Sequence, residues 1–140
     1  MITTDLDFHA YLSEVVSTAG WSIRAAATVE EAIPETRDRS CSLVIYDCNE
    51  TDDWRGAFDR LRSVNSTTCL LLASRVTDPY LWQEVIDAGG FDVLPRSAPQ
   101  DELIRKLRFA WFWNERWQPT SNRRIGWGSE KPRNQNDASQ

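Results

Sequence analysis

The stretch Leu43-Val44-Ile45-Tyr46-Asp47 decides the fold of this chain, because four consecutive residues with little polarity lead directly into a carboxylate. A second stretch, Cys69-Leu70-Leu71-Leu72-Ala73, is entirely apolar and leads into Ser74. Continuous apolar runs of this length are typical of strands that are buried on both faces of a parallel sheet. Two weaker runs, residues 21–25 and 91–94, predict further strands on either side of this pair in the chain.

Apolar residues at helical spacing predict a first helix before these strands, ending near Gly20: Phe8, Leu12, Val15, Val16 and Ala19. Thr28 and Glu31 form a capping-box pattern that opens a second helix. Pro34 lies inside that helix and removes a backbone donor, so we expect it to kink or shorten the helix.

Three more helices are predicted by their caps. Asp52 or Asp53 caps a third helix, and its apolar stripe consists of Trp54, Ala57, Phe58 and Leu61. Asp78 and Pro79 open a fourth helix that ends at residues 89–90, and Pro99 precedes a fifth that runs to about residue 117. Alternating strands and helices of this kind are typical of α/β proteins with a parallel sheet covered on both faces.

Composition limits the classes of protein that fit. The 140 residues, 41% of them hydrophobic and 26% charged, suit one domain over residues 1–118, and the polar residues 119–140 suggest a flexible tail. The net charge of -5 with scattered cations disfavours nucleic-acid binding. No apolar stretch approaches the roughly 20 residues that span a bilayer. Three cysteines without paired spacing, and no secretory leader pattern, favour the cytoplasm.

Polar residues follow three of the predicted strands: Asp47, Ser74 and Arg96. Ligands of open parallel sheets collect at the carboxyl ends of the strands, so these residues are the first candidates for a site. A carboxylate can act as a nucleophile toward phosphorus, a hydroxyl can bond the transferred oxygens, and a cation can neutralise them. The sequence therefore points to phosphoryl chemistry at this edge of the sheet.

The order of these strands and strand-end residues resembles the response-regulator receiver family over roughly residues 5–108. The resemblance implies a flavodoxin-like (βα)5 doubly wound sheet in the order 2-1-3-4-5. It also implies a Mg²⁺ ion at the site and an aspartyl phosphate, formed when a histidine kinase or phosphotransfer protein donates its phosphoryl group. By position, Asp47 matches the phosphoacceptor and Ser74 the hydroxyl residue. Asn49 matches the residue whose carbonyl helps to hold the metal.

Several positions depart from the family pattern. The acidic pair that binds Mg²⁺ should fall near Thr3 and Thr4, whereas the nearest carboxylates are Asp5 and Asp7. The expected metal ligands are therefore Asp47, Asn49 and Asp5, a set that would hold Mg²⁺ weakly or not at all. Arg96 replaces the family's lysine, and Val93 stands where a switch aromatic is usual. One hypothesis is that Arg96 pairs directly with Asp47 and holds the domain in one state.

The beginning of the sequence also departs from the family. Only Met1 and Ile2 precede the expected acidic positions, where a central strand of about five residues is normal. This spacing predicts either a shortened first strand or a start that has been placed late. His9 is the only histidine, and we expect it to be bonded locally or exposed to solvent.

The last predicted helix is unusually aromatic. A core-facing stripe of Leu103, Leu107, Ala110 and Trp111 leaves Phe109, Phe112, Trp113 and Trp117 around the rest of the helix. We expect this surface to dock an effector protein or a second copy, in preference to covering the shortened strand.

Together these features predict a stand-alone receiver domain in a phosphorelay, not an enzyme, with Asp47 as phosphoacceptor and output by protein contact. The alternative is a phosphorylation-independent pseudo-receiver that docks or dimerises.

Overall fold

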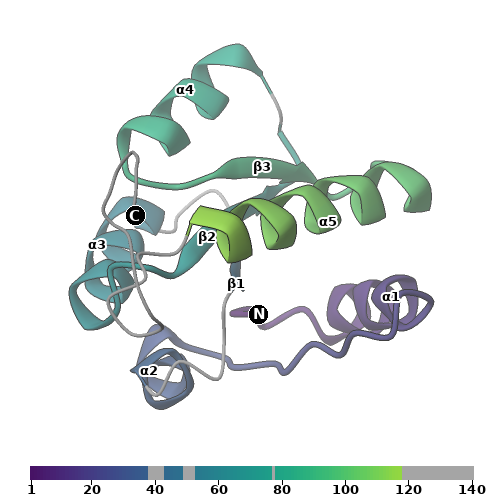
Figure 1. The fold of residues 1–140 in the computed structure, drawn as a ribbon, viewed down its shortest axis with the longest axis horizontal. Helices are drawn as coiled ribbons and strands as arrows, with labels where there is room; N and C mark the ends of the chain where they lie inside the picture. The colour runs from purple at the N-terminus through teal and green to yellow at the C-terminus, as the bar shows by residue number, and fades with distance from the viewer. Residues whose placement is uncertain (38–42, 49–52, 77, 118–140) are drawn as a thin grey trace, which may run out of the picture.

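The structure is a computed structural model that describes residues 1–37, 43–48, 53–76 and 78–117. Within these residues, five helices and three strands follow one another along the chain (Figure 1). Their bounds are α1 Leu6–Ser17, α2 Val29–Arg37, β1 Leu43–Asp47, α3 Trp54–Val64, β2 Cys69–Ser74, α4 Pro79–Asp87, β3 Asp92–Pro95 and α5 Gln100–Trp117. The predicted α/β class is confirmed. The predicted tail, residues 119–140, lies outside the described residues.

The three strands form a parallel sheet in the order β1-β2-β3. Ile2 extends this arrangement, because it forms isolated parallel bridges with Tyr46 on one side and Ala26 on the other. The first strand is therefore shortened to a single bridging position, as the spacing before the acidic positions predicted. The complete order 2-1-3-4-5 stays a prediction, since the described sheet has three strands.

The strand predicted over residues 21–25 does not form in the described structure. A strand needs a neighbouring backbone over its whole length, and here only the first residues of the chain lie alongside. Met1 N donates to Arg24 O, Ala26 N donates to Met1 O, and Thr3 N donates to Ala26 O. The segment is extended but lacks the continuous ladder of backbone hydrogen bonds that defines a strand. The prediction of a strand from its residue types was therefore wrong.

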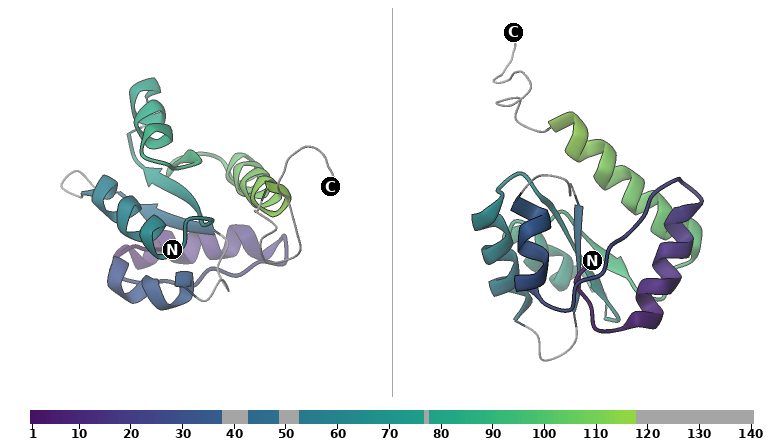
Figure 2. Two further views of the ribbon diagram at one scale, coloured as in Figure 1. Left: turned by 60° about the vertical axis from the view of Figure 1, so that its left-hand side comes forward. Right: turned by 90° about the horizontal axis from the view of Figure 1, so that it is seen from below.

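Two apolar layers cover the faces of the sheet, and strand side chains alternate between them. Ile45, Leu71 and Leu94 point into a core shared with α1 and α5. Val44, Leu72 and Val93 point into a second core, which contains residues of α2, α3 and α4. The right-hand view of Figure 2 shows α1 and α5 on one side of the sheet with α2 and α3 on the other. The doubly wound architecture is thus confirmed.

The helix caps read from the sequence are present. Asp53 caps α3 by accepting from Gly56 N at 3.0 Å, and Asp78 caps α4 by accepting from Leu81 N at 2.7 Å. Asp52, the other candidate for the cap of α3, lies outside the described residues. Thr28 and Glu31 make one bond of the predicted capping box, with Thr28 Oγ1 accepting from Glu31 N, while Glu31 Oε1 accepts from Ala27 N, one residue before the cap. These local bonds fix where the helices begin.

The orientation of α5 differs from the predicted one at Trp111. Leu103, Leu107 and Ala110 are buried as expected, but Trp111 is 40% exposed, and Asn114 takes the next buried position. Asn114 follows Ala110 by four residues, so the buried stripe continues straight along the helix. The Trp111 ring instead packs on Trp21, with 6.1 Å between the ring centroids.

No helix among the described residues combines the length and apolarity that crossing a bilayer requires.

Candidate functional site

The carboxyl ends of the three strands lie side by side and bring together the predicted residues. Asp47 ends β1, Ser74 ends β2, and Arg96 directly follows β3. Cys48 N donates to Ala73 O and Arg96 N donates to Ser74 O, each at 2.9 Å. These backbone bonds hold the first residues after β1 and β3 against the end of β2. The backbone positions from which the side chains of the site extend are therefore fixed relative to one another.

Arg96 lies between two carboxylates. Its Nη1 donates to Asp47 Oδ1 at 3.1 Å and to Asp47 Oδ2 at 3.2 Å, and its Nη2 donates to Asp5 Oδ2 at 2.5 Å. Only 13% of the Arg96 side chain and 7% of the Asp47 side chain are exposed, against 34% for Asp5. The direct pairing of Arg96 with Asp47 hypothesised from the sequence is present.

The ring of Phe8, on α1, covers the guanidinium. The central carbon of that group lies 4.1 Å from the Phe8 ring centroid, which is within the range of a cation–π contact. Phe8 itself is buried. Because the guanidinium is planar and always charged, it can stack on the ring and bond both carboxylates with its edge. Nothing in the sequence pattern pointed to this role of Phe8.

Thr3 supplies a further donor to Asp47. Its hydroxyl donates to Asp47 Oδ2 at 2.6 Å and accepts from Asp5 N at 2.9 Å. The side chain is buried, and Thr3 is one of the two positions where the family pattern calls for an acid. Counting residues along the chain found the position, but it did not reveal that a hydroxyl donor there would bond Asp47.

Asp5 serves both the site and helix α1. Its Oδ1 accepts from Phe8 N at 3.0 Å and so caps the helix, while Oδ2 accepts from Arg96. The hydrogen bond from Arg96, followed by that from Phe8 N, holds the pKa of Asp5 below its usual value of 3.8. Asp5 is therefore a carboxylate at neutral pH. Arg75 approaches the same oxygen only to 3.8 Å and is largely exposed.

Ser74 is at the predicted strand end, but its hydroxyl is engaged elsewhere. Its Oγ donates to Val76 O at 2.7 Å and accepts from Val76 N at 3.1 Å, which closes a turn after β2. The hydroxyl has one proton, and that proton is used in the turn. Among the described residues Ser74 makes no hydrogen bond with Asp47.

The arrangement of the described residues at this site does not fit a Mg²⁺ ion. Mg²⁺ takes oxygen ligands in near-octahedral geometry, usually including one or two carboxylates. Here Arg96 bonds both oxygens of Asp47 and one oxygen of Asp5, and the other Asp5 oxygen caps α1. The described residues contain no group of three or more acidic, histidine or cysteine side chains arranged to hold a metal. The third predicted ligand, Asn49, lies outside the described residues.

A separate cavity of about 710 Å³ lies beside the amino half of β1. Its lining is mainly apolar and comes from the segment 21–26, Leu43–Ile45, α2 and the α5 residues Leu107 and Trp111. Asp47, Ser74 and Arg96 are not among the lining residues. The polar side chains of its lining include Glu31, which accepts from Ala27 N, Glu35, which pairs with Arg24, and Thr36, which donates to Ala32 O, so we assign no catalytic role to the cavity.

His9 has the local role expected for it. Its Nε2 lies 2.9 Å from Ile23 O and 3.3 Å from Ser13 Oγ. These contacts tie α1 to the extended segment that follows it. His9 is therefore part of the packing of α1.

Solved structures with a similar fold include response-regulator receiver domains. A CheY-like receiver domain protein of Methanospirillum hungatei superimposes with a TM-score of 0.70 at 11% identity, covering 82% of this chain and 93% of its own. The fold is that of the response-regulator receiver domain. CheY4 of Vibrio cholerae gives a TM-score of 0.67 at 20% identity, with coverages of 78% and 93%. An orphan response regulator of H. pylori gives 0.66 at 12% identity, with coverages of 78% and 91%.

The likeness of this chain to receiver domains is carried by structure. No family model and no curated protein matches the sequence. The receiver fold explains why a carboxylate, a hydroxyl and a cation meet at one edge of the sheet, because the carboxyl ends of parallel strands share that edge.

Proposed function

We propose that this chain is a receiver-type signalling domain whose output is the docking of a partner protein on an aromatic surface of α5. This surface, called here the α5 aromatic surface, consists of Phe91, Phe109, Phe112 and Trp113. The observation that carries the proposal is its exposure: 56% for Phe109, 55% for Phe112 and 44% for Trp113. Rings of this size contribute much of the binding energy of protein interfaces when they are buried.

Three of the four rings, those of Phe91, Phe109 and Trp113, form a cluster. The centroid distances are 5.8 Å for Phe91 to Phe109, 6.2 Å for Phe109 to Trp113 and 6.4 Å for Phe91 to Trp113. Because these three rings already contact one another, they have little side-chain freedom left to lose when a partner covers them. The side chain of Trp117, the fourth aromatic predicted for this surface, lies outside the described residues.

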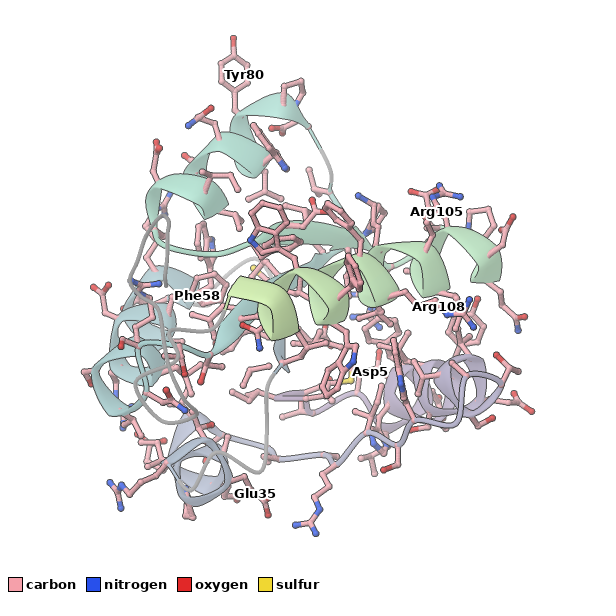
Figure 3. All side chains as sticks on the ribbon, in the orientation of Figure 1. Asp5, Glu35, Phe58, Tyr80, Arg105 and Arg108 are labelled. Carbon is pink, nitrogen blue, oxygen red and sulfur yellow. The ribbon has the colours of Figure 1, made fainter. Side chains whose placement is uncertain are left out.

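Two cations lie beside the aromatic rings. Arg105 and Arg108 are exposed on α5, as Figure 3 shows, and together with Phe109 and Phe112 they follow the spacing i, i+3, i+4, i+7 of one helical stripe. Such a stripe suits a partner helix that packs along α5. The charge of the stripe favours a partner that presents carboxylates.

The geometry at Asp47 favours an input other than phosphorylation of that residue. Arg96 bonds both carboxylate oxygens, Thr3 bonds one of them, and the Asp47 side chain is 7% exposed. An attacking oxygen would first have to lose these contacts. The proposed domain is therefore the phosphorylation-independent form of a receiver.

A second candidate function is a phosphorelay receiver in which a histidine kinase or phosphotransfer protein supplies a phosphoryl group to Asp47. The meeting of Asp47, Ser74 and Arg96 at one edge of the sheet supports it, since this is the nucleophile, hydroxyl and cation set that the sequence predicted. The intact mass of the chain after treatment with acetyl phosphate separates the two candidates.

The docking proposal is tested by comparing Phe109→Ser/Phe112→Ser with the native chain. Proteins captured from the source cells on the native chain are identified, purified and measured by calorimetry against each variant. Tyr80→Ser is the matched control, because Tyr80 is an exposed aromatic on α4. We expect the double variant to lose binding and the control to keep it. A partner that binds both variants equally would place the interface elsewhere.

Self-association is measured separately by sedimentation of the same three proteins. A native dimer that the double variant loses would make a second copy the partner.

A further inference from the structure

We infer that Arg96 is a resident cation that takes the place of a divalent metal ion at the Asp47 site, so that the native chain binds no Mg²⁺ there. The inference goes beyond the docking function, because it concerns the strand-end site and not the α5 aromatic surface. It follows from the disagreement between the receiver fold and the contacts of the carboxylates.

Among the described residues of the site, all four carboxylate oxygens of Asp5 and Asp47 already accept a hydrogen bond. Asp47 Oδ1 accepts from Arg96, and Asp47 Oδ2 accepts from Arg96 and Thr3. Asp5 Oδ1 accepts from Phe8 N, and Asp5 Oδ2 accepts from Arg96. A Mg²⁺ ion would have to share these oxygens with the donors that they already bond, while lying next to a fixed positive charge.

Arg96 is held in place from several directions. Its backbone N–H donates to Ser74 O at 2.9 Å, the Phe8 ring covers its guanidinium at 4.1 Å, and 13% of the side chain is exposed. A guanidinium does not lose its proton in proteins, so its charge persists at any working pH. The cation is therefore a permanent part of the fold, unlike an ion that exchanges with solvent.

Removal of the guanidinium should convert the site into a metal site. In Arg96→Ala, both Asp47 oxygens and Asp5 Oδ2 lose the donor that neutralises them, and two carboxylates then face one another across the space that it leaves. Two carboxylates completed by water are a ligand set that Mg²⁺ accepts. Thr3 would stay as a donor to Asp47 Oδ2.

The experiment measures Mg²⁺ binding by calorimetry and by thermal unfolding, at constant ionic strength, for the native chain and three variants. The native chain and Arg75→Ala, which removes an exposed cation at the edge of the same site, should show no Mg²⁺-dependent change. Arg96→Ala should bind Mg²⁺ and shift its Tm upward by roughly 3 to 8 °C at saturation. Arg96→Ala/Asp47→Asn should lose that shift.

Mg²⁺ binding by the native chain with the affinity of Arg96→Ala would overturn the inference. So would an Arg96→Ala shift that survives Asp47→Asn, or a folded Arg96→Ala that binds no Mg²⁺. Circular dichroism verifies the fold of each variant. If Arg96→Ala does not fold, Arg96→Gln tests the same loss of charge with a longer side chain. These readouts do not depend on docking, so the two proposals can fail separately.

Discussion

Arg96 Nη1 lies 3.1 Å from one carboxylate oxygen of Asp47 and 3.2 Å from the other, and thereby joins residues 49 positions apart in the chain. The contact connects the end of β1 to the residue that follows β3 and leads toward α5. Through Nη2 the same side chain also holds Asp5 at the start of α1. One guanidinium thus links three elements at the edge of the sheet where receiver folds carry their chemistry.

Arg96→Ala should lower the free energy of unfolding by about 3 kcal/mol, because it leaves the nearly buried Asp47 carboxylate without its cation. Urea denaturation measures this loss. Arg75→Ala is the control, since its contact with Asp5 is long and exposed, and it should change stability by less than about 0.5 kcal/mol. Equal losses in the two variants would show that the Arg96 bridge does not stabilise the fold.

Thr3→Val should cost about 1 kcal/mol, because the shape is kept while the hydrogen bond to Asp47 Oδ2 is lost. Thr3→Ser, which retains the hydroxyl, should keep most of the native stability. Thr4→Val is a matched control at the neighbouring exposed position. All three are compared by thermal and urea unfolding, and a Thr4→Val loss as large as that of Thr3→Val would contradict the assigned contact.

The native chain should gain no phosphoryl group on incubation with acetyl phosphate and Mg²⁺, because Asp47 is engaged by Arg96 and Thr3 and the site does not fit the metal. Intact mass spectrometry provides the readout, with Asp47→Asn treated in parallel. A single adduct on the native chain that is missing from Asp47→Asn would favour the phosphorelay function instead.

Acid should weaken the fold partly through Asp5. The hydrogen bond from Arg96, and then that from Phe8 N, lower the pKa of Asp5 in the folded state below 3.8. Its stabilising contribution is therefore complete above the unfolded pKa and is lost as the pH falls through the folded value. The free energy of unfolding of the native chain, measured from neutral pH downward, should begin to approach that of Asp5→Asn near pH 3.8 and converge on it only as the pH falls through the lower folded pKa. Arg96→Ala should reduce the pH-dependent part of this difference, and a difference that stays constant with pH would contradict the linkage.

Phe112→Ser should leave the free energy of unfolding within about 0.5 kcal/mol of the native value, because more than half of this side chain is exposed. Leu107→Ala, on the buried side of the same helix, should cost about 2 to 5 kcal/mol. Urea denaturation of both variants checks the assignment of the two faces. A large loss in Phe112→Ser would mean that this ring belongs to the core, and it would weaken the docking proposal.

The sequence by itself determined the elements whose signals are local. The apolar runs ending in Asp47 and Ser74 became β1 and β2, and Asp53 and Asp78 cap the helices that they were expected to open. Strand burial and helix capping depend on residues close together in the chain, so residue type and spacing suffice to read them. The convergence of Asp47, Ser74 and Arg96 also followed, because parallel strands end at one edge of the sheet.

Only the tertiary structure decided what each side chain bonds at that edge. The Ser74 hydroxyl donates to Val76 O, and Thr3, at a position where the family pattern has an acid, donates to Asp47. Arg96 donates to both the Asp47 and the Asp5 carboxylates. These outcomes depend on competition among donors and acceptors from distant elements over a few ångströms, which spacing along the chain does not encode. The same reason applies to residues 21–25, which have β-forming side chains but lack a neighbouring strand to pair with, since pairing requires a partner that local propensity cannot supply.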